Sequence, residues 1–205
     1  IDLGKAPPSN NYISKDNYHS KEQTFPLRVM VCNHCWLVQT QDFSKANELF
    51  TDEYAYFSST SKSFLAHSKN YVSEITSLLK LNHKSFVVEL ASNDGYLLEN
   101  FVKLGIPCLG IEPTKSTAKV SREKGIETVE EFFGTDFAKQ LSKINKADLI
   151  IGNNVYAHVP DINDFTCGIK ELLSSNGTVT LEFPHLVELV KNNQFDTIYH
   201  EHYSY

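Results

Sequence analysis

The spacing of hydrophobic residues changes near residue 86. From Phe86 onward, short apolar runs alternate with amphipathic stretches, and turn residues separate the two. The runs predict buried strands and the stretches predict helices. The expected strands cover residues 86–90, 107–112, 126–129, 147–151 and 178–183. One expected helix ends at Lys103, and three more cover residues 115–124, 135–143 and 161–173.

This alternation predicts an α/β fold with a doubly wound, Rossmann-like parallel sheet. Gly125 is expected to terminate one helix, Asp161 to cap another, and Asn176-Gly177 to form a turn. In such sheets, ligands bind at the carboxyl ends of the strands, near the switch in strand order. We therefore expect a ligand site at these strand ends.

The residues before this alternation follow other patterns. Residues 1–26 have little periodicity and several prolines, so irregular structure is expected. Residues 27–31 and 36–39 indicate two short strands of a hairpin whose turn carries Cys32 and Cys35. Residues 62–80 have the spacing of an amphipathic helix.

Composition narrows the class of protein. The formal charge is −6 and the lysines are scattered, which argues against a nucleic-acid groove. No apolar run approaches the roughly 18 residues of a membrane helix, and no signal peptide is visible at the N-terminus. The four cysteines suit a reducing cytoplasm better than a disulfide scaffold. The first residue is not Met and the last ones are a histidine and aromatic cluster, so we expect a fragment that is cut at both ends.

Three strand ends carry residues suited to a nucleotide. Gly95 allows close approach of the backbone in the first turn, and Glu112, about 20 residues later, can accept both hydroxyls of a ribose. The fourth strand ends in polar residues that can contact a purine or an amino acid portion, and Phe132-Phe133 can flank a purine or simply pack. The expected cofactor-binding residues are Glu89, Asn93, Asp94, Gly95, Glu112, Asn153 and Asn154.

The first turn also indicates which nucleotide binds. A dinucleotide site uses Gly-x-Gly-x-x-Gly because a pyrophosphate lies against bare backbone, whereas this turn has one glycine and adds Asp94. A carboxylate repels a pyrophosphate but suits a sulfonium and an amino group, which favours S-adenosylmethionine over NAD. The alternative is that Asp94 only caps the next helix and Glu112 is a solvated strand end.

The same residues resemble a known family. The runs 88–98, Gly110-Ile111-Glu112-Pro113, 153–160 and Tyr54 to Ser59 are similar to sugar C-methyltransferases, class I S-adenosylmethionine-dependent enzymes acting on nucleotide-linked keto-deoxysugars. The most specific string is Phe-Asp-Thr-Ile-Tyr-His-Glu-His at 195–202. The resemblance covers nearly the whole chain. It implies a partial zinc-binding domain at 1–48, a helical connection at 49–82, a methyltransferase domain at 83–190 and the start of a catalytic segment at 191–205, with a C-terminal domain absent.

The resemblance also implies a zinc site, from which this chain departs. The family uses two pairs of cysteines, and only Cys32 and Cys35 are present here. A Cys-x-x-Cys on a turn supplies half of a tetrahedral zinc site. A redox role is disfavoured because the flanking residues predict strands and not a thioredoxin-like unit. We expect a half-site that is vacant or weakly loaded with zinc.

Methylation beside a ketone needs a base for the α-proton and a donor for the enolate oxygen. By resemblance, His202 is the base and Tyr199 the donor, with Glu201 or Tyr56 orienting or contacting the sugar. His158 is a further candidate for substrate contact, although it and His185 can equally be structural. Tyr199 and His202 share a face if the segment is helical. An extended segment would bring His200 and His202 together and favour a metal site.

The expected function is therefore C-methylation of a nucleotide-linked, dTDP-type 4-keto-deoxysugar with S-adenosylmethionine. Two alternatives stay open. The chain can be an S-adenosylmethionine-binding module without activity, or an NAD-dependent oxidoreductase, which the missing glycines disfavour. The sequence does not predict the oligomeric state.

Overall fold

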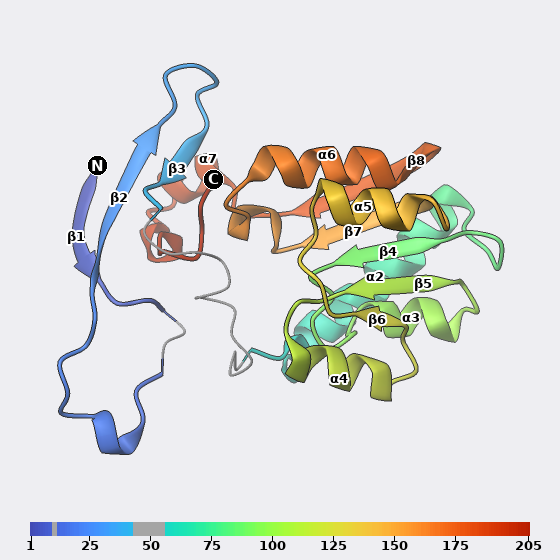
Figure 1. Ribbon diagram of the computed structural model, residues 1–205, viewed down its shortest axis with the longest axis horizontal. Coiled ribbons are helices and arrows are strands. Elements are labelled where there is room, and N and C mark those ends of the chain that lie inside the picture. The colour runs from blue at the N-terminus through green and yellow to red at the C-terminus, as the bar shows by residue number, and fades with distance from the viewer. Residues whose placement is uncertain (10–11, 43–55) are drawn as a thin grey trace. The chain divides into compact units, whose positions relative to one another are not determined.

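The computed structural model describes residues 1–9, 12–42 and 56–205 (Figure 1). They belong to two compact units that alternate along the chain. The sheet unit comprises Asp52–Asn153 and Asp161–Leu181, and the terminal unit comprises Ile1–Thr51, Asn154–Pro160 and Glu182–Tyr205. The four expected divisions of the chain stay a prediction, and residues 43–55, with Tyr54 and Ala55 of the similar runs, lie outside the described residues.

A five-stranded sheet forms the centre of the sheet unit in the described part of the chain. Its strands are β4 (Val87–Leu90), β5 (Cys108–Ile111), β6 (Thr128–Val129), β7 (Ala147–Asn153) and β8 (Leu173–Glu182). Their spatial order is β6-β5-β4-β7-β8, and β4 is parallel to both β5 and β7. The order reverses at β4, so the predicted doubly wound class is confirmed and the switch point lies beside β4.

Helices cover both faces of this sheet, as Figure 1 shows: α5 and α6 lie on one face and α2, α3 and α4 on the other. Their bounds are α2 (Lys62–Leu79), α3 (Leu98–Lys103), α4 (Lys115–Glu123), α5 (Thr135–Ser142) and α6 (Ile162–Leu172). The predicted caps are confirmed. Asp161 accepts a hydrogen bond from the Asp164 amide, and Gly125 has a left-handed φ of 80° just after α4.

The core of the sheet unit lies between β4 and the helices that precede and follow it. Val72 and Ile75 of α2 pack with Phe101 of α3 against Val87 of β4 and Ile151 of β7. Every residue of β4 is buried, which is why it reads as a continuous apolar run except at Glu89. Burial of one such side chain contributes roughly 1.5–3 kcal/mol, so this cluster holds the tip of β4 in place.

The prediction for the last strand was wrong in one respect. The expected turn at Asn176-Gly177 lies inside β8, which begins at Leu173 directly after α6. Gly177 is needed there for space, because a Cβ would lie 2.7 Å from the Ala147 carbonyl oxygen and 2.8 Å from the Leu173 side chain. A glycine that admits a close neighbour gives the same sequence signal as a glycine in a turn.

The terminal unit contains a small antiparallel sheet of β1 (Asp2–Ala6), β2 (Phe25–Val31) and β3 (Val38–Thr40). The predicted hairpin of β2 and β3 is confirmed. The expectation of irregular structure before residue 26 was wrong for β1, whose residues are mostly exposed and therefore carry no apolar alternation. Its remaining elements are α7 (Leu186–Lys191) and short 3-10 helices at Lys15–Asn17, Tyr156–His158 and Phe195–Thr197, while another, Ser58–Thr60, belongs to the sheet unit.

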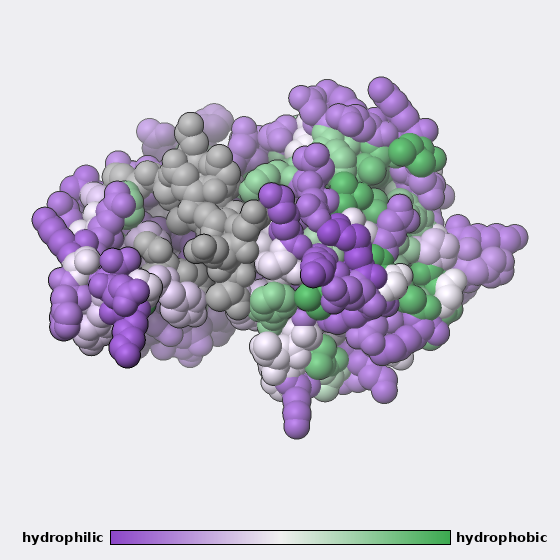
Figure 2. All heavy atoms as spheres, turned by 60° about the horizontal axis from the view of Figure 1, so that its bottom comes forward, coloured by the Kyte–Doolittle hydropathy of each residue, from purple (hydrophilic) through white to green (hydrophobic). Residues whose placement is uncertain are grey.

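In the view of Figure 2, polar side chains separate the apolar patches that the described residues form. Isolated exposed apolar residues such as Leu78 and Ile144 are ordinary on folded proteins. Among the described residues, no helix is both long and apolar enough to cross a membrane.

Candidate active site

The turn after β4 adopts left-handed backbone at alternate positions. Ala91, Asn93 and Gly95 have φ values of 53°, 49° and 75°. Only the last of these is the glycine that such a conformation favours. For Ala91 the left-handed region costs on the order of 1–2 kcal/mol, and strain of this kind concentrates at functional sites. Counting glycines therefore understated the number of left-handed positions in this turn.

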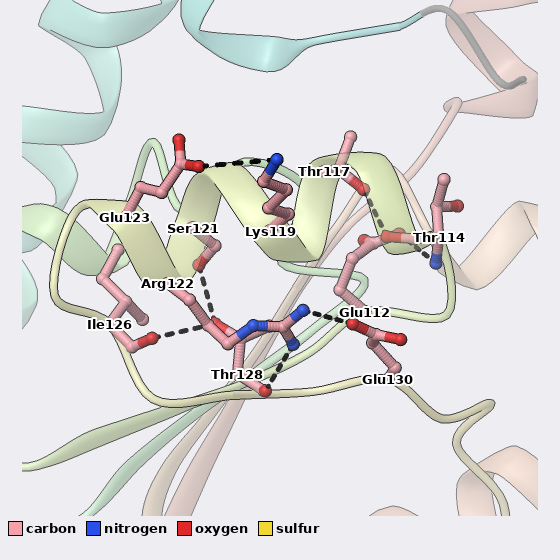
Figure 3. Close-up of polar contacts among 10 residues, drawn as sticks. All are labelled: Glu112, Thr114, Thr117, Lys119, Ser121, Arg122, Glu123, Ile126, Thr128 and Glu130. Atoms are coloured by element: carbon pink, nitrogen blue, oxygen red, sulfur yellow. Dashed lines mark hydrogen bonds and ion pairs between the residues drawn. The ribbon is translucent and has the colours of Figure 1, made fainter. Parts of the chain in front are cut away.

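Gly95 has a second reason to be glycine. A Cβ there would lie 2.3 Å from Cδ1 of Ile126 and 2.7 Å from Oγ of Ser121. Ser121 is fixed on α4 by its hydrogen bond with the Thr128 hydroxyl at 2.7 Å, and Arg122 holds the Thr128 carbonyl oxygen and Glu130 (Figure 3). The turn is thus packed against the α4–β6 connection.

Glu112 follows β5 and is almost fully buried, 4% exposed. One carboxylate oxygen accepts the Asn93 amide at 2.8 Å. The other accepts the Thr114 amide at 2.9 Å, a contact that Figure 3 shows. Burial raises the pKa of Glu112, and the Thr114 and Asn93 amides oppose that rise. The alternative of a solvated strand end is wrong. The Thr114 and Thr117 side chains also hydrogen-bond this carboxylate, so a ribose diol bound there would displace them.

Glu89 and Asp94 lie deeper, at 1% and 0% exposure. Burial raises the pKa of Glu89 well above its usual value, and the charges of Glu112 and Asp94 raise it further. Among the described residues, Glu89 Oε2 and Ser92 Oγ are buried without a hydrogen-bond partner. Buried polar atoms of this kind usually have one. They suit a site whose ligand brings hydrogen-bond donors, and Ser92 was missed by the sequence reasoning.

Asp94 forms an ion pair with Lys124, whose Nζ lies 3.4 Å from Oδ2 and donates to the Asp94 carbonyl oxygen at 2.7 Å. The alternative that Asp94 caps α3 is wrong, because the cap position is Leu97 and receives no side-chain hydrogen bond. Lys124, which the sequence did not single out, shows that Asp94 accepts an ammonium group. A ligand amino group would compete with this lysine.

Asn93 joins the turn to the main chain at Tyr56. Its Oδ1 accepts the Ser58 amide at 2.9 Å and its Nδ2 donates to the Tyr56 carbonyl oxygen at 3.1 Å. The Tyr56 side chain itself is exposed. The structure therefore brings two predicted residues, one for the cofactor and one for the substrate, to the same strand end.

The end of β7 separates its two asparagines. Asn153 is half-buried at the strand end, whereas Asn154 is exposed and donates from Nδ2 to Glu182 at 2.7 Å. A pocket of about 430 Å³ lies at the start of α5. Its lining residues are Glu131, Phe132, Phe133, Gly134, Asp136, Phe137, Gln140 and Asp164. Phe133 packs edge-on against Phe165, whereas Phe132 is half-exposed and can contact a ligand.

In the terminal unit, Tyr199 and His202 face each other, as the helical spacing predicted. The Tyr199 hydroxyl lies 3.0 Å from His202 Nε2, and a turn closes between them with the His202 amide donating to the Tyr199 carbonyl oxygen. His202 Nδ1 lies 2.9 Å from the Thr197 carbonyl oxygen. Because a carbonyl oxygen only accepts, Nδ1 carries the proton in the neutral ring, and the lone pair of Nε2 accepts a hydrogen bond from the Tyr199 hydroxyl.

His158 lies beside this pair, with its ring centroid 4.5 Å from that of His202. Burial lowers the pKa of His158 to about 4, opposed by a hydrogen bond to the Glu201 main chain. Burial, and then the neighbouring His158, lower the pKa of His202 to about 4. Both rings are therefore neutral at neutral pH, which a general base requires. His185 does not join them, because it caps α7 through the Glu188 amide.

We expect His158 and His202 to lower the free energy of unfolding of the protein at acidic pH. Unfolded histidine binds a proton near pH 6.5, whereas these rings do so near pH 4, so the unfolded state binds more protons between these values. Glu89 and Glu112 act in the opposite direction, and comparison with His158→Gln cancels their effect. Wild type should lose stability relative to this variant by roughly 1.4 kcal/mol for each pH unit below 6.5. Urea unfolding at pH 7.5, 6 and 5 measures the difference.

The exposed His83→Gln is the control for this prediction. A stability difference between wild type and His158→Gln that stays constant with pH would refute the assignment of a lowered pKa to His158.

His200 and Glu201 point away from the pair. His200 Nε2 lies 3.2 Å from the Pro26 carbonyl oxygen, and Glu201 accepts a hydrogen bond from the Ser9 hydroxyl at 2.8 Å. The alternative of an extended segment that brings His200 and His202 together is therefore wrong. In the described part of the chain, no group of three or more His, Cys, Asp or Glu residues is placed to hold a metal. The rival metal site at this string is not supported.

Cys32 and Cys35 lie on the turn between β2 and β3. Main-chain hydrogen bonds from Cys35 and His34 to the Cys32 sulfur lower the pKa of Cys32, which favours the thiolate that binds metal. Two thiols are half of a tetrahedral set, and the described residues supply no third ligand. These residues alone do not fit a complete zinc site.

Comparison with known families agrees with this architecture. Residues 63–205 match a family model described as "Methyltransferase domain", and residues 1–50 match one described as "Putative zinc binding domain". The chain belongs to the methyltransferase domain family. It is 34% identical over 206 residues to the C-methyltransferase NovU of Streptomyces niveus, an alignment that covers 100% of this chain and 49% of NovU. The chain therefore spans about half the length of this curated relative.

A solved structure shows the same fold. The S-adenosylmethionine-dependent methyltransferase from Archaeoglobus fulgidus superposes with a TM-score of 0.53 at 15% identity, covering 68% of this chain and 61% of that one. The sheet unit thus has the class I methyltransferase fold that the sequence predicted.

Proposed function

We propose that the protein is an S-adenosylmethionine-dependent C-methyltransferase that acts beside the carbonyl group of a nucleotide-linked keto-deoxysugar. The observation that carries the proposal is the Tyr199–His202 pair, in which a neutral imidazole presents Nε2 to a phenol. A carbon acid needs such a base, whereas a hydroxyl or amine acceptor has less need of one. The similarity to NovU, named a C-methyltransferase, supports the same class.

The sheet unit supplies the cofactor side. Glu112 is held by the Asn93 and Thr114 amides and is the acid proposed to bind the ribose diol, and Asp94, which accepts the Lys124 ammonium group, favours a cationic ligand over a pyrophosphate. The acidic pocket with Phe132 suits a purine that carries an amino group. When bound, S-adenosylmethionine supplies a methyl group on a positively charged sulfur.

The terminal unit supplies the acceptor side. His202 Nε2 removes the α-proton, and Nδ1 keeps its own proton on the Thr197 carbonyl oxygen. For this step the Tyr199 hydroxyl turns from Nε2 to the substrate, which frees the Nε2 lone pair, and donates a hydrogen bond to the developing enolate oxygen, which stabilises the carbanion for attack on the methyl group. His158 of this unit and Tyr56 of the sheet unit are proposed to contact or orient the sugar, whereas Glu201 is held by Ser9 instead. Zinc has no step in this chemistry.

Two measurements test the proposal. Calorimetry should detect binding of S-adenosylmethionine and no binding of NADH at the same concentration. With a keto-sugar nucleotide and ¹³C-methyl donor, NMR should show the label bonded to carbon. Binding of NADH in the same site would instead identify an oxidoreductase, and a label on oxygen or nitrogen would exclude C-methylation. Binding of the donor without transfer would indicate a binding module.

A further inference from the structure

The last residues of the chain pair with the N-terminal sheet. The Thr40 amide donates to the Tyr203 carbonyl oxygen at 3.2 Å, and the Tyr205 amide donates to the Val38 carbonyl oxygen at 3.0 Å. Gln39 and Ser204 form an antiparallel bridge. β3 thus has β2 on one side and residues 203–205 on the other, so the string that contains His202 ends as an added strand of this sheet.

Side chains of the N-terminal sheet and string reinforce this pairing. The Thr40 hydroxyl donates to the main-chain carbonyl oxygen of His202 at 2.5 Å. His200 reaches the Pro26 carbonyl oxygen of β2, and Ser9 reaches Glu201. Three consecutive residues of the string are therefore each held by a residue from the first forty.

Burial also points to the contact between the N-terminal sheet and residues 200–202. Among the described residues up to 42, Leu27 and Thr40 are the buried ones, whereas Met30, Val31 and Trp36 near the cysteine turn are exposed. His200, Glu201 and His202 are buried. Removing the Thr40 hydroxyl would leave the buried His202 carbonyl oxygen without this donor, which costs more than the hydrogen bond itself contributes.

We propose that the N-terminal sheet positions the catalytic base, with Thr40 as the positioning residue that fixes the main chain of His202. The proposal rests on the proposed function for the role of His202. Thr40 fixes the His202 carbonyl oxygen and Thr197 fixes the ring at Nδ1, so the backbone and the imidazole are both held and the direction of Nε2 is set. This assigns to the region that matches a zinc-binding domain a role in methyl transfer that needs no metal in the reaction.

Thr40→Val tests this role because it keeps the shape and removes the hydroxyl. We expect kcat to fall about 10-fold or more, because small misplacements of a reacting group are costly, with the Kd of S-adenosylmethionine unchanged. Thr40→Ser should restore kcat. Thr166→Val is the matched control, since it removes a hydroxyl that also donates to a carbonyl oxygen, that of Ile162 in α6, and it should leave kcat unchanged.

A second readout does not depend on turnover. In Thr40→Val the His202 carbonyl oxygen loses its donor and the string loosens, so the NMR titration of the His202 ring should move upward toward pH 6.5, while Thr40→Ser should titrate as wild type. A shift without any methyl transfer in wild type would support the positioning role and reject the proposed function. Wild-type transfer with an unshifted His202 and an unchanged kcat in Thr40→Val would reject the positioning role.

Ser9→Ala keeps the proposal testable if Thr40→Val fails to fold. Ser9 is exposed, so this variant should fold and lose only the contact to Glu201. A fall in kcat of about 3-fold or more at constant Kd for the methyl donor supports the role of the N-terminal sheet, with the net worth of one hydrogen bond setting this scale. An unchanged kcat in Ser9→Ala counts against it.

Discussion

Replacing His202 by asparagine is expected to lower kcat for methyl transfer by about 10²–10⁴-fold, the usual contribution of a positioned general base. Asparagine keeps a donor near the position of Nδ1, so the contact with the Thr197 carbonyl oxygen can persist while the basic Nε2 is lost. The Kd of S-adenosylmethionine should not change, because the acids expected to bind it lie in the sheet unit.

Deuterium exchange separates the base from the donor. With S-adenosylhomocysteine bound in heavy water, wild type should exchange the α-proton of a keto-sugar nucleotide, and His202→Asn should not. Tyr199→Phe keeps the base and removes the donor to the enolate, for which a loss of about 10²-fold is typical. Exchange in His202→Asn at more than a tenth of the wild-type rate would show that another group is the base.

Replacing Gly95 by alanine is expected to cost roughly 3 kcal/mol of unfolding free energy. About 1 kcal/mol comes from the left-handed backbone, and the rest comes from overpacking against Ile126 and Ser121. The affinity for S-adenosylmethionine should fall as well, because relief of the clash moves the turn that presents the Asn93 amide to Glu112. Urea unfolding and calorimetry measure the two effects.

Gly125→Ala is the matched control for this substitution. Gly125 has a similar φ of 80°, but nothing lies within 4 Å of the position of an added Cβ. Gly125→Ala should therefore lower the free energy of unfolding by only about 1 kcal/mol, the cost of the left-handed backbone. Equal losses of stability in the two variants would show that the close approach of residue 95 to Ile126 and Ser121 does not affect the free energy of unfolding.

The parts of the fold that follow from local periodicity were predictable. A few neighbouring residues are enough to predict the strands β4 and β5, the end of α4 at Gly125 and the cap at Asp161. Glu112 was also predictable as a strand-end acid, although its two amide partners were not. β1 was missed because an exposed strand has no apolar pattern, and α7 because six residues are too few to show one.

The candidate site was harder to predict because its contacts join distant residues. Nothing local shows that Lys124 pairs with Asp94, that Asn93 holds the Tyr56 carbonyl oxygen, or that His158 lies beside His202. The Ala91 and Asn93 conformations were hidden for another reason. Tertiary packing imposes left-handed backbone on residues that do not favour it, so the sequence shows one glycine where the structure has three left-handed positions.

The pairing of β3 with the last residues also determines the order of events during synthesis. Thr40 and His202 are 162 residues apart, and the ribosome adds about 5–20 residues each second, so the edge of β3 waits roughly 10–30 s for its partner. The sheet unit is translated during that interval. A nascent chain that stalls before residue 203 therefore carries an open strand edge, which makes it a substrate for chaperones and prone to associate with its neighbours.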